Sequence, residues 1–458
     1  MNLYTPVEVV SSMPLLSQEN NLLLMGSCFA SEMGQRLADA KFRCDVNPYG
    51  VLYNPFSISA ALREIIAGRC YNENDIFLFH ELWHSAMHHG SFSSVSAEET
   101  LAGINGRLKS AHERLDRLDC LLLTFGSAWV YENKKTGTVV ANCHKQPESC
   151  FTRRMLSVCE IVSDYTSLLS GLLARIPRLK VLFTVSPIRH VRDGMHANQL
   201  SKATLLLAVN QLQATFPEHV FYFPAYELLL DELRDYRFYA EDMVHPSETA
   251  IRYVWERFTR SCISADALRI MEESENIRKM LSHKPFYPAS EEYKRFLGQI
   301  VLKIDQLNGK YPYLDFQKER EIMSYSIESI TESIGARRMG NAPATIDWLL
   351  TDSRSLNFPE ETLFFALTTK RNDGARYIAD LYARGVRNFV LSEESFRLMD
   401  NGQLTIDNAM QRDDAQSIVN YLIVPNPLKA LQKLAEQHRN RFQIPVIGYY
   451  GEATVRLL

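Results

Sequence analysis

The sequence lacks any C-x-x-C pair, although it contains eight cysteines, all between positions 28 and 262. This scatter fits neither a disulfide framework nor a cysteine-rich zinc site, and it suits a reducing compartment. Basic runs interleaved with aromatic residues are also missing, and the formal net charge is −4. The sequence therefore predicts no nucleic-acid partner and no electrostatic attraction to an anionic membrane.

Long apolar runs are absent as well, and the first 19 residues have no basic start and no continuous apolar core. We therefore expect no signal peptide, no membrane span and a cytoplasmic location. The composition is that of a globular protein, with 46% hydrophobic and 23% charged residues. A chain of 458 residues exceeds one ordinary core, so two or more domains are expected.

Residues 21–262 alternate continuous apolar runs with segments of helical spacing. Such strands separated by helices predict an α/β fold, with a mostly parallel sheet covered on both faces in a three-layer α/β/α (flavodoxin-like) arrangement. A surface hairpin is expected within 130–140. Strands are predicted at 22–25, 120–125, 181–185 and 220–223, and helices at 32–40, 58–67, 98–118, 158–176, 202–215 and 247–259.

The rest of the chain divides by pattern into further segments. Residues 1–20 form an irregular lead-in, and 263–322 read as charged helices and a linker. From 323 to 446, helical and strand patterns alternate over shorter lengths, which predicts a small second α/β domain. Residues 447–458 are interpreted as an aberrant or truncated tail.

A candidate nucleophile lies where the first apolar run ends, at Gly26, Ser27 and Cys28. A strand-turn-helix corner of this kind exposes a small side chain and directs backbone N–H groups at an oxyanion. Far downstream, Asp242 and His245 form an Asp-x-x-His pair in which the carboxylate can orient the imidazole. Ser27 and Cys28 both remain candidates. The structural alternatives are a small buried cysteine and a surface histidine that flanks a helix.

These residues are part of a longer series of blocks: Gly-Ser-Cys-Phe-Ala at 26–30, Asn-Pro-Tyr-Gly at 47–50, Phe-Gly-Ser-Ala-Trp at 125–129, Ser-Pro-Ile-Arg-His at 186–190 and Asp-Met-Val-His-Pro at 242–246. Over about residues 21–260 the series resembles the GSCFA-domain family, which resembles the SGNH or GDSL hydrolases. The resemblance implies a hydrolase or acyltransferase acting on an ester or thioester of a small molecule or glycan. Aligned without gaps, it puts Cys28 at the nucleophile position, with Ser27 as the alternative if the turn is shifted by one residue.

The same resemblance implies that Gly50 and Gly126 contribute to an oxyanion hole. The third block should read Gly-x-Asn, yet this chain has Gly126-Ser127-Ala128, so Ser127 or the N–H of Trp129 would have to replace the amide. Because this departure puts ordinary esterase activity in doubt, a non-catalytic ligand-binding domain is the alternative function.

His80-Glu81-Leu82-Trp83-His84 matches the H-E-x-x-H pattern, which on a helix would place two imidazoles on one face for zinc. A zinc-dependent hydrolase is therefore a second alternative. No metzincin continuation follows and no third ligand is evident, so we expect no metal and no other cofactor. The preferred interpretation makes His84, His88 and His89 a polar wall of the substrate pocket, with hydrogen-bonded loop histidines as the structural alternative.

Three further residues are candidates for substrate binding. Arg189 and His190 end an apolar strand, where α/β proteins place ligand contacts. The Arg189 guanidinium could bind a carboxylate or phosphate, or form an ordinary surface ion pair. Trp129 closes the third block and is also placed in the substrate pocket.

Asp352, Ser353 and Arg354 open an ordered set of blocks within 323–446. By residue type alone they are turn residues. The set resembles the N-terminal UDP-binding domain of the Mur ligases, especially the ligase that adds D-alanyl-D-alanine. This implies a UDP-sugar-peptide ligand at these three residues and a bacterial cell-envelope (peptidoglycan) context. The expected P-loop lysine is missing and Glu452 would repel phosphate, so ligase activity is not expected.

Overall fold

The computed structural model divides the chain into two compact units. The first unit comprises Met1–Ser282 with Gln306–Leu314, and the second comprises His283–Asp305 with Asp315–Leu458. The structure describes residues 5–9, 14–282, 291–323, 325–346, 348–356, 358–369, 372–400 and 419–440. The predicted tail at 447–458 lies outside this part of the chain.

A five-stranded sheet forms the centre of the first unit, and every pairing in it is parallel. Four of its strands are the predicted apolar runs. The fifth, β2, has the sequence Arg-Cys-Asp-Val, which carries no continuous apolar signal. In spatial order the strands are β10 (Val220–Tyr222), β9 (Lys180–Val185), β5 (Cys120–Phe125), β1 (Asn21–Gly26) and β2 (Arg43–Val46).

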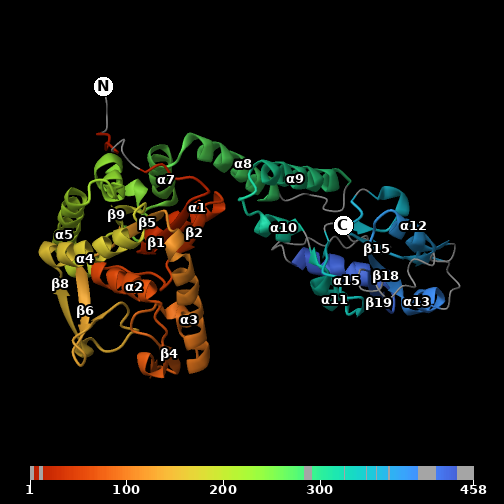
Figure 1. The fold of residues 1–458 in the computed structure, drawn as a ribbon, viewed down its shortest axis with the longest axis horizontal. Coiled ribbons are helices and arrows are strands. Elements are labelled where there is room, and N and C mark those ends of the chain that lie inside the picture. The colour runs from red at the N-terminus through yellow and green to blue at the C-terminus, as the bar shows by residue number, and fades with distance from the viewer. Residues whose placement is uncertain are drawn as a thin grey trace, which may run out of the picture. The chain divides into compact units, whose positions relative to one another are not determined.

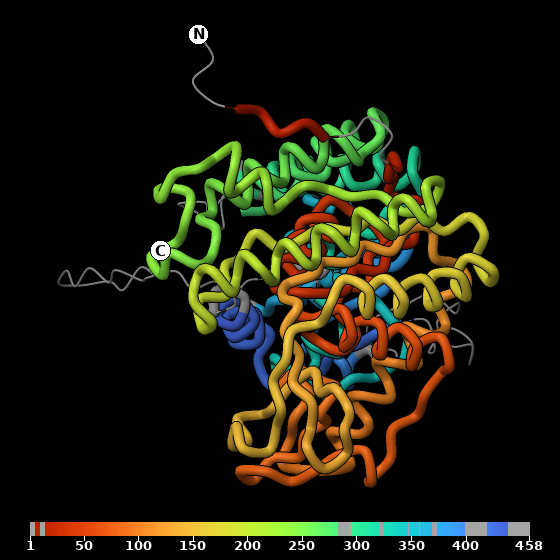
Figure 2. The backbone as a smooth tube through the Cα atoms, turned by 90° about the vertical axis from the view of Figure 1, so that its left-hand side faces the viewer, coloured from red at the N-terminus to blue at the C-terminus, as the bar shows by residue number. Residues whose placement is uncertain are grey.

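Helices cover both faces of this sheet (Figures 1 and 2). Side chains of β1 alternate between the two cores: Leu23 and Met25 pack on one face, and Leu22 and Leu24 on the other. This arrangement confirms the predicted three-layer α/β/α class. The first core contains α2 (Pro55–Ala67), α3 (Ala97–Arg114), α4 (Val158–Arg175) and α5 (Gly194–Thr215), and the second contains α1 (Cys28–Asp39) and α7 (Glu248–Cys262).

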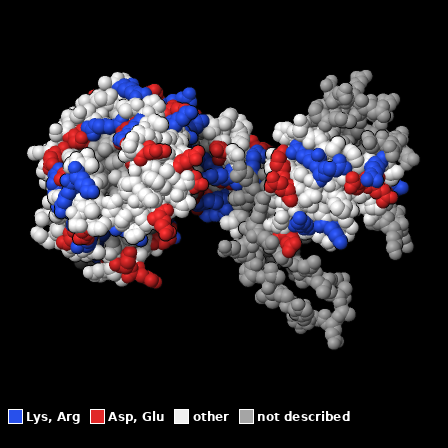
Figure 3. Space-filling model, turned by 90° about the horizontal axis from the view of Figure 1, so that it is seen from below, with Lys and Arg blue, Asp and Glu red and all other residues white. Residues whose placement is uncertain are grey.

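Two small antiparallel elements extend from the first unit. The predicted hairpin is present as β6 (Trp129–Asn133) and β7 (Val139–Val140), and β8 (Phe151–Met155) joins the other edge of β6. A second hairpin pairs β3 (Phe77–Phe79) with β4 (Leu82–His84). Acidic and basic side chains are interspersed on the face of this unit seen in Figure 3, which is consistent with the small net charge.

In the described residues of the segment that was predicted to be helical, the structure has α8 (Ala265–Ser282), α9 (Glu291–Lys310) and α10 (Gln317–Met323). The second unit then has its own five-stranded sheet, in the order β12 (Arg337–Met339), β19 (Asn420–Val424), β18 (Asn388–Ser392), β15 (Thr362–Phe365) and β14 (Trp348–Leu350). Only the pairing of β12 is antiparallel within it. Its helices include α11 (Ile327–Ile334), α12 (Ile378–Ala383) and α15 (Pro427–Asn440), which confirms the smaller second α/β domain.

No helix in the described residues is long and apolar enough to cross a membrane.

Candidate active site

The turn between β1 and α1 requires glycine at its first position. Gly26 has φ = 145°, and a Cβ there would meet the carbonyl oxygen of Thr124 at 2.2 Å. The Gly26 N–H donates to Asn47 Oδ1 at 2.9 Å, and Asn47 Nδ2 donates to Ser31 Oγ at 2.8 Å. Asn47 therefore ties the strand end to the first turns of α1, which fixes the position of the two candidate nucleophiles.

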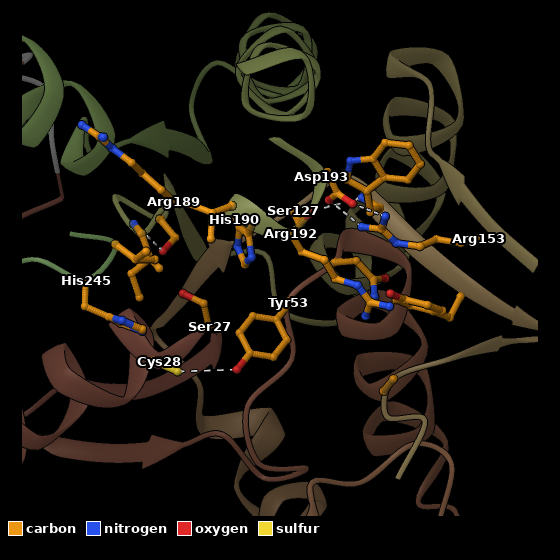
Figure 4. A pocket seen from close by; sticks show the side chains of 18 of the residues that line it. Ser27, Cys28, Tyr53, Ser127, Arg153, Arg189, His190, Arg192, Asp193 and His245 are labelled. Carbon is orange, nitrogen blue, oxygen red and sulfur yellow. Dashed lines mark hydrogen bonds and ion pairs between the residues drawn. The ribbon is translucent and has the colours of Figure 1, made fainter. Parts of the chain in front are cut away.

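Ser27 and Cys28 have different surroundings. Ser27 is the N-cap residue of α1, yet its hydroxyl makes no capping bond. Ser27 is 1% exposed, and its Oγ has no partner among the described residues. Cys28 is the first residue of α1 and is half-buried, with Sγ 3.6 Å from Tyr53 Oη. Both residues line the same pocket (Figure 4).

The predicted Asp242–His245 pair is formed. Asp242 Oδ2 lies 2.6 Å from His245 Nδ1, and Asp242 Oδ1 accepts the backbone N–H groups of Val244 and His245, each at 2.9 Å. The backbone N–H of His245, followed by its imidazole, lowers the pKa of Asp242 to about 2. Asp242 is therefore a carboxylate at neutral pH, and it leaves His245 Nε2 as the ring nitrogen available for proton transfer.

A pocket of about 410 Å³ brings seven of the predicted site residues together. Its lining includes Ser27, Cys28, Ser127, Trp129, Arg189, His190 and His245. The loops that follow β1, β5 and β9 supply much of this lining. These loops leave the carboxyl ends of adjacent parallel strands, where open α/β sheets bind their ligands.

The β6–β8 element and the loop after β9 form the other end of the pocket. Arg153 makes a two-pronged ion pair with Asp193, and its guanidinium carbon lies 4.4 Å from the centre of the Trp129 ring. Arg192 lies 5.9 Å from the centre of the Tyr131 ring and forms an exposed ion pair with Glu148. Sequence analysis missed Arg153 and Arg192, because neither belongs to a recognisable motif.

Arg189 and His190 both line the pocket, and their role in substrate binding stays a prediction. Arg189 Nη2 donates to Tyr239 Oη at 2.7 Å, and Figure 4 shows its side chain directed away from Cys28 and Tyr53. Only part of Arg189 therefore contributes to the pocket wall. Burial, followed by the charge of Lys202, lowers the pKa of His190 to about 4, so its imidazole is neutral at neutral pH.

The two glycines predicted for the oxyanion hole use their N–H groups elsewhere. Gly50 donates to the carbonyl oxygen of Asn47 and Gly126 to that of Tyr53, each at 2.8 Å. Ser127 Oγ is paired with Ser201 Oγ at 3.3 Å, whereas Trp129 Nε1 is buried without a partner among the described residues. The donors predicted at Gly50 and Gly126 are thus occupied, the first by a turn hydrogen bond and the second by a bond to the loop that contains Tyr53.

Lys202 supports two of the pocket loops from beneath and was not identified as a site residue. It is 1% exposed, and its Nζ donates to the carbonyl oxygens of Gly126 and Ser186, each at 2.7 Å. Burial lowers the pKa of Lys202 to about 7. Because Gly126 follows β5 and Ser186 follows β9, this side chain joins two strand ends below the pocket.

The segment with the H-E-x-x-H pattern is a hairpin rather than a helix. His80 and Glu81 occupy the turn between β3 and β4 with φ values of 46° and 65°. His84 is buried, with Nδ1 2.6 Å from Ser93 Oγ and Nε2 3.1 Å from the Phe79 carbonyl oxygen. The zinc interpretation needs a helix here, and that prediction is therefore wrong.

His88 and His89 also lie outside the pocket lining, as does His84. His88 is 1% exposed and stacks on Tyr49, with ring centroids 4.3 Å apart. Burial, followed by the charge of Arg69, lowers its pKa to about 3. His89 Nδ1 accepts the N–H of Ser91. These histidines are therefore hydrogen-bonded structural residues, and they do not form a wall of this pocket.

Asp352, Ser353 and Arg354 lie in the second unit, at a short 3-10 turn over Ser353–Ser355. Asp352 Oδ1 accepts the N–H of Arg354, and its Oδ2 pairs with the Arg354 guanidinium at 2.6 Å. These residues therefore form the turn that their residue types predict. The UDP-binding role stays a prediction.

No curated protein matches the chain. Among solved structures, an acetyl xylan esterase (Est2A) from the rumen bacterium Butyrivibrio proteoclasticus is similar, with 10% identity and a TM-score of 0.28. That match covers 53% of this chain and 64% of the esterase chain, so it spans less than two thirds of the esterase.

Two family models match the chain, one over most of the first unit and one over the segment that follows α7. The model for the C-terminal domain of GSCFA domain proteins matches residues 274–328. The resemblance of 323–446 to the Mur ligases is not confirmed. The GSCFA family model matches residues 21–258, which hold every candidate catalytic residue, and the chain therefore belongs to the GSCFA family.

Proposed function

We propose that the first unit is a hydrolase or acyltransferase that acts on an ester or thioester through Cys28, His245 and Asp242. The observation that carries this proposal is the meeting of Cys28 and His245 at one pocket, with His245 held by Asp242 at 2.6 Å. A nucleophile, a base and a group that orients the base are the three parts of a triad.

In the proposed first step, His245 Nε2 takes the thiol proton and the sulfur attacks the carbonyl carbon of the substrate. The carbon–sulfur bond forms while the leaving oxygen or sulfur departs with the proton from His245. The product is a thioester on Cys28. Water or a sugar hydroxyl then attacks that thioester, gives its proton to His245 and releases the acid or the new ester. The proton returns to Cys28, and the site is restored.

Cys28 is favoured over Ser27 as the nucleophile for two reasons. Cys28 is partly accessible, whereas Ser27 is 1% exposed and its hydroxyl is enclosed by protein. Cys28 also begins α1, where the helix dipole favours a negative sulfur. The first N–H groups of a helix have no acceptor within the helix, so the N–H of Cys28 is suited to a developing oxyanion.

The substrate part of the proposal is coarser. Trp129 and Tyr131 give the pocket aromatic walls, and both have guanidinium groups on their faces. Aromatic walls fit an acyl group or a sugar ring. A cell-envelope glycan as acceptor, and a UDP-sugar-peptide at the second unit, are proposals that depend on the resemblance described above.

The test is intact-mass spectrometry of the full chain after exposure to a panel of acyl esters and acyl-CoA thioesters. We expect one acyl adduct on the peptide with Ser27 and Cys28, lost in Cys28→Ala and strongly slowed in His245→Ala. Cys159→Ala is the matched control, because Cys159 is an exposed free cysteine outside the pocket. An adduct that persists in Cys28→Ala and disappears in Ser27→Ala would move the nucleophile to Ser27. Absence of any adduct or turnover would favour a ligand-binding pocket.

A further inference from the structure

Tyr53 places its hydroxyl oxygen 3.6 Å from the Cys28 sulfur. It lies in the loop between β2 and α2, outside every motif identified from the sequence. Figure 4 shows the phenol ring reaching across the pocket, with its hydroxyl directed at Cys28. A phenol hydroxyl that reaches a nucleophile can act on the group that the nucleophile attacks.

The backbone around Tyr53 is fixed on three sides. The Tyr53 carbonyl oxygen accepts the N–H groups of Gly126 at 2.8 Å and Ser127 at 3.0 Å. The preceding N–H, that of Leu52, donates to the carbonyl oxygen of Gly26 at 2.9 Å. The next residue, Asn54, caps α2 through its side chain. Tyr53 is therefore attached to the ends of both β1 and β5, next to the nucleophile turn.

The ring of Tyr53 also has a defined position. It meets the His190 ring edge-on, with centroids 5.9 Å apart. Tyr53 is 41% exposed, because its ring borders the open pocket. Burial, followed by the hydrogen bond with Cys28, raises the pKa of Tyr53 to about 12, so the hydroxyl keeps its proton at neutral pH.

The N–H of Cys28 is one donor for the oxyanion, and a second has to come from another group, because the third block has no asparagine and the Gly50 and Gly126 N–H groups are occupied. Building on the function proposed above, we infer that Tyr53 is a catalytic residue whose hydroxyl donates a hydrogen bond to the oxyanion that forms when Cys28 attacks the substrate carbonyl. That oxygen is attached to the carbon that bonds to sulfur. A donor 3.6 Å from the sulfur therefore lies next to the place where the negative charge develops.

The role makes acylation and alkylation of Cys28 respond differently to Tyr53→Phe. Attack on an acyl ester creates an oxyanion, whereas displacement of iodide from iodoacetamide at a saturated carbon creates none. We expect Tyr53→Phe to slow acylation by about 10²-fold, as for loss of one oxyanion donor. Its kcat should fall while KM stays near the wild-type value, and the alkylation rate should remain close to wild type.

Tyr165→Phe is the structural control. Tyr165 is buried and donates to the Pro55 carbonyl oxygen at 2.9 Å, so its loss should lower the melting temperature without a selective effect on acylation. Equal acylation in Tyr53→Phe and wild type would overturn the inference while leaving the proposed function intact. An equal loss of acylation and alkylation would also overturn it, because Tyr53 would then act on the thiol. A wild-type enzyme that is alkylated at Cys28 but never acylated would overturn both proposals.

Discussion

Two histidine-bearing regions of the first unit differ in the burial and the hydrogen bonds of their imidazole rings. In the segment 80–89, His84 and His88 are buried, and each has at least one ring nitrogen in a hydrogen bond to a serine hydroxyl. In the loop 240–246, the side chain of His245 is 51% exposed and is held through Nδ1 alone by Asp242. The first region has the denser histidine pattern, yet only the second contributes to the pocket.

A histidine that transfers protons differs from one that serves packing in the surroundings of its ring nitrogens. A ring whose nitrogens are occupied, or whose burial strongly disfavours the charged form, serves packing. A ring held at one nitrogen and open at the other can take and return a proton. The surroundings of Nε2 therefore predict function better than the number of histidines in a stretch.

The largest expected effect is on activity when His245 is removed. His245→Ala should lower kcat/KM for an acyl ester by about 10³-fold, because His245 is the pocket imidazole that a carboxylate orients as a base. The melting temperature should change little, since the side chain is half-exposed. His196→Ala, an exposed histidine on α5, provides the control. Full activity in His245→Ala would remove the distinction between the two regions.

His88→Ala should have the reverse pattern. The substitution leaves a cavity between Tyr49 and Tyr71, both of which contact the imidazole, and it leaves Ser85 Oγ without its ring partner. We expect a loss of about 2–3 kcal/mol in the free energy of unfolding. Urea denaturation measures it, and the kcat per folded molecule should stay at the wild-type level. A selective fall in kcat would give His88 a part in the site.

A smaller effect is expected from pH, and it isolates the burial of His88. The pKa of His88 is lowered to about 3 in the folded protein, so between pH 6.5 and 4.5 the unfolded chain binds a proton that the native chain does not. Stability should therefore fall as pH falls, by about 2 kcal/mol over these two pH units. Arg69 and His144 add to burial as causes of the shift.

The measurement compares wild type with His88→Gln, because buried His190 also has a lowered pKa and would contribute to the wild-type curve. The difference in unfolding free energy between the two proteins should shrink by that amount from pH 6.5 to 4.5. A difference independent of pH would show that His88 titrates as an ordinary surface histidine.

Much of the scaffold follows from local sequence. Because β1, β5 and β9 are buried on both faces, their sequences are continuous apolar runs, and the capping serines of α4 and α7 mark helix starts. Cys28 and Asp242 could also be predicted from local sequence. Cys28 directly follows the turn after a strand, and Asp242 is three residues from its partner histidine.

The remaining site residues depend on contacts that no local pattern records. Tyr53 approaches Cys28 only because its loop is bonded to the ends of β1 and β5. Arg153 reaches the pocket because β8 pairs with β6, a tertiary choice that its own sequence does not specify. Conversely, the helical spacing of the histidines does not produce a helix. Phe77–Phe79 form a strand, and the turn that follows places His80 and Glu81 at positive φ.

The smallest expected effect is that of zinc, and it tests whether the histidine-rich segment 80–89 has a function of its own. His80 lies in the tight turn of the hairpin and His84 at the end of β4, and both nitrogens of His84 already have partners. Among the residues that the structure describes, no three His, Cys, Asp or Glu side chains are grouped to hold a metal. We therefore expect neither a chelator nor added zinc to change the melting temperature or the rate of Cys28 acylation. Stoichiometric zinc that stabilises the wild type and is lost in His84→Ala would mean that the histidine-rich segment is functional after all. It would also mean that occupied ring nitrogens are a poor guide to which histidines do chemistry.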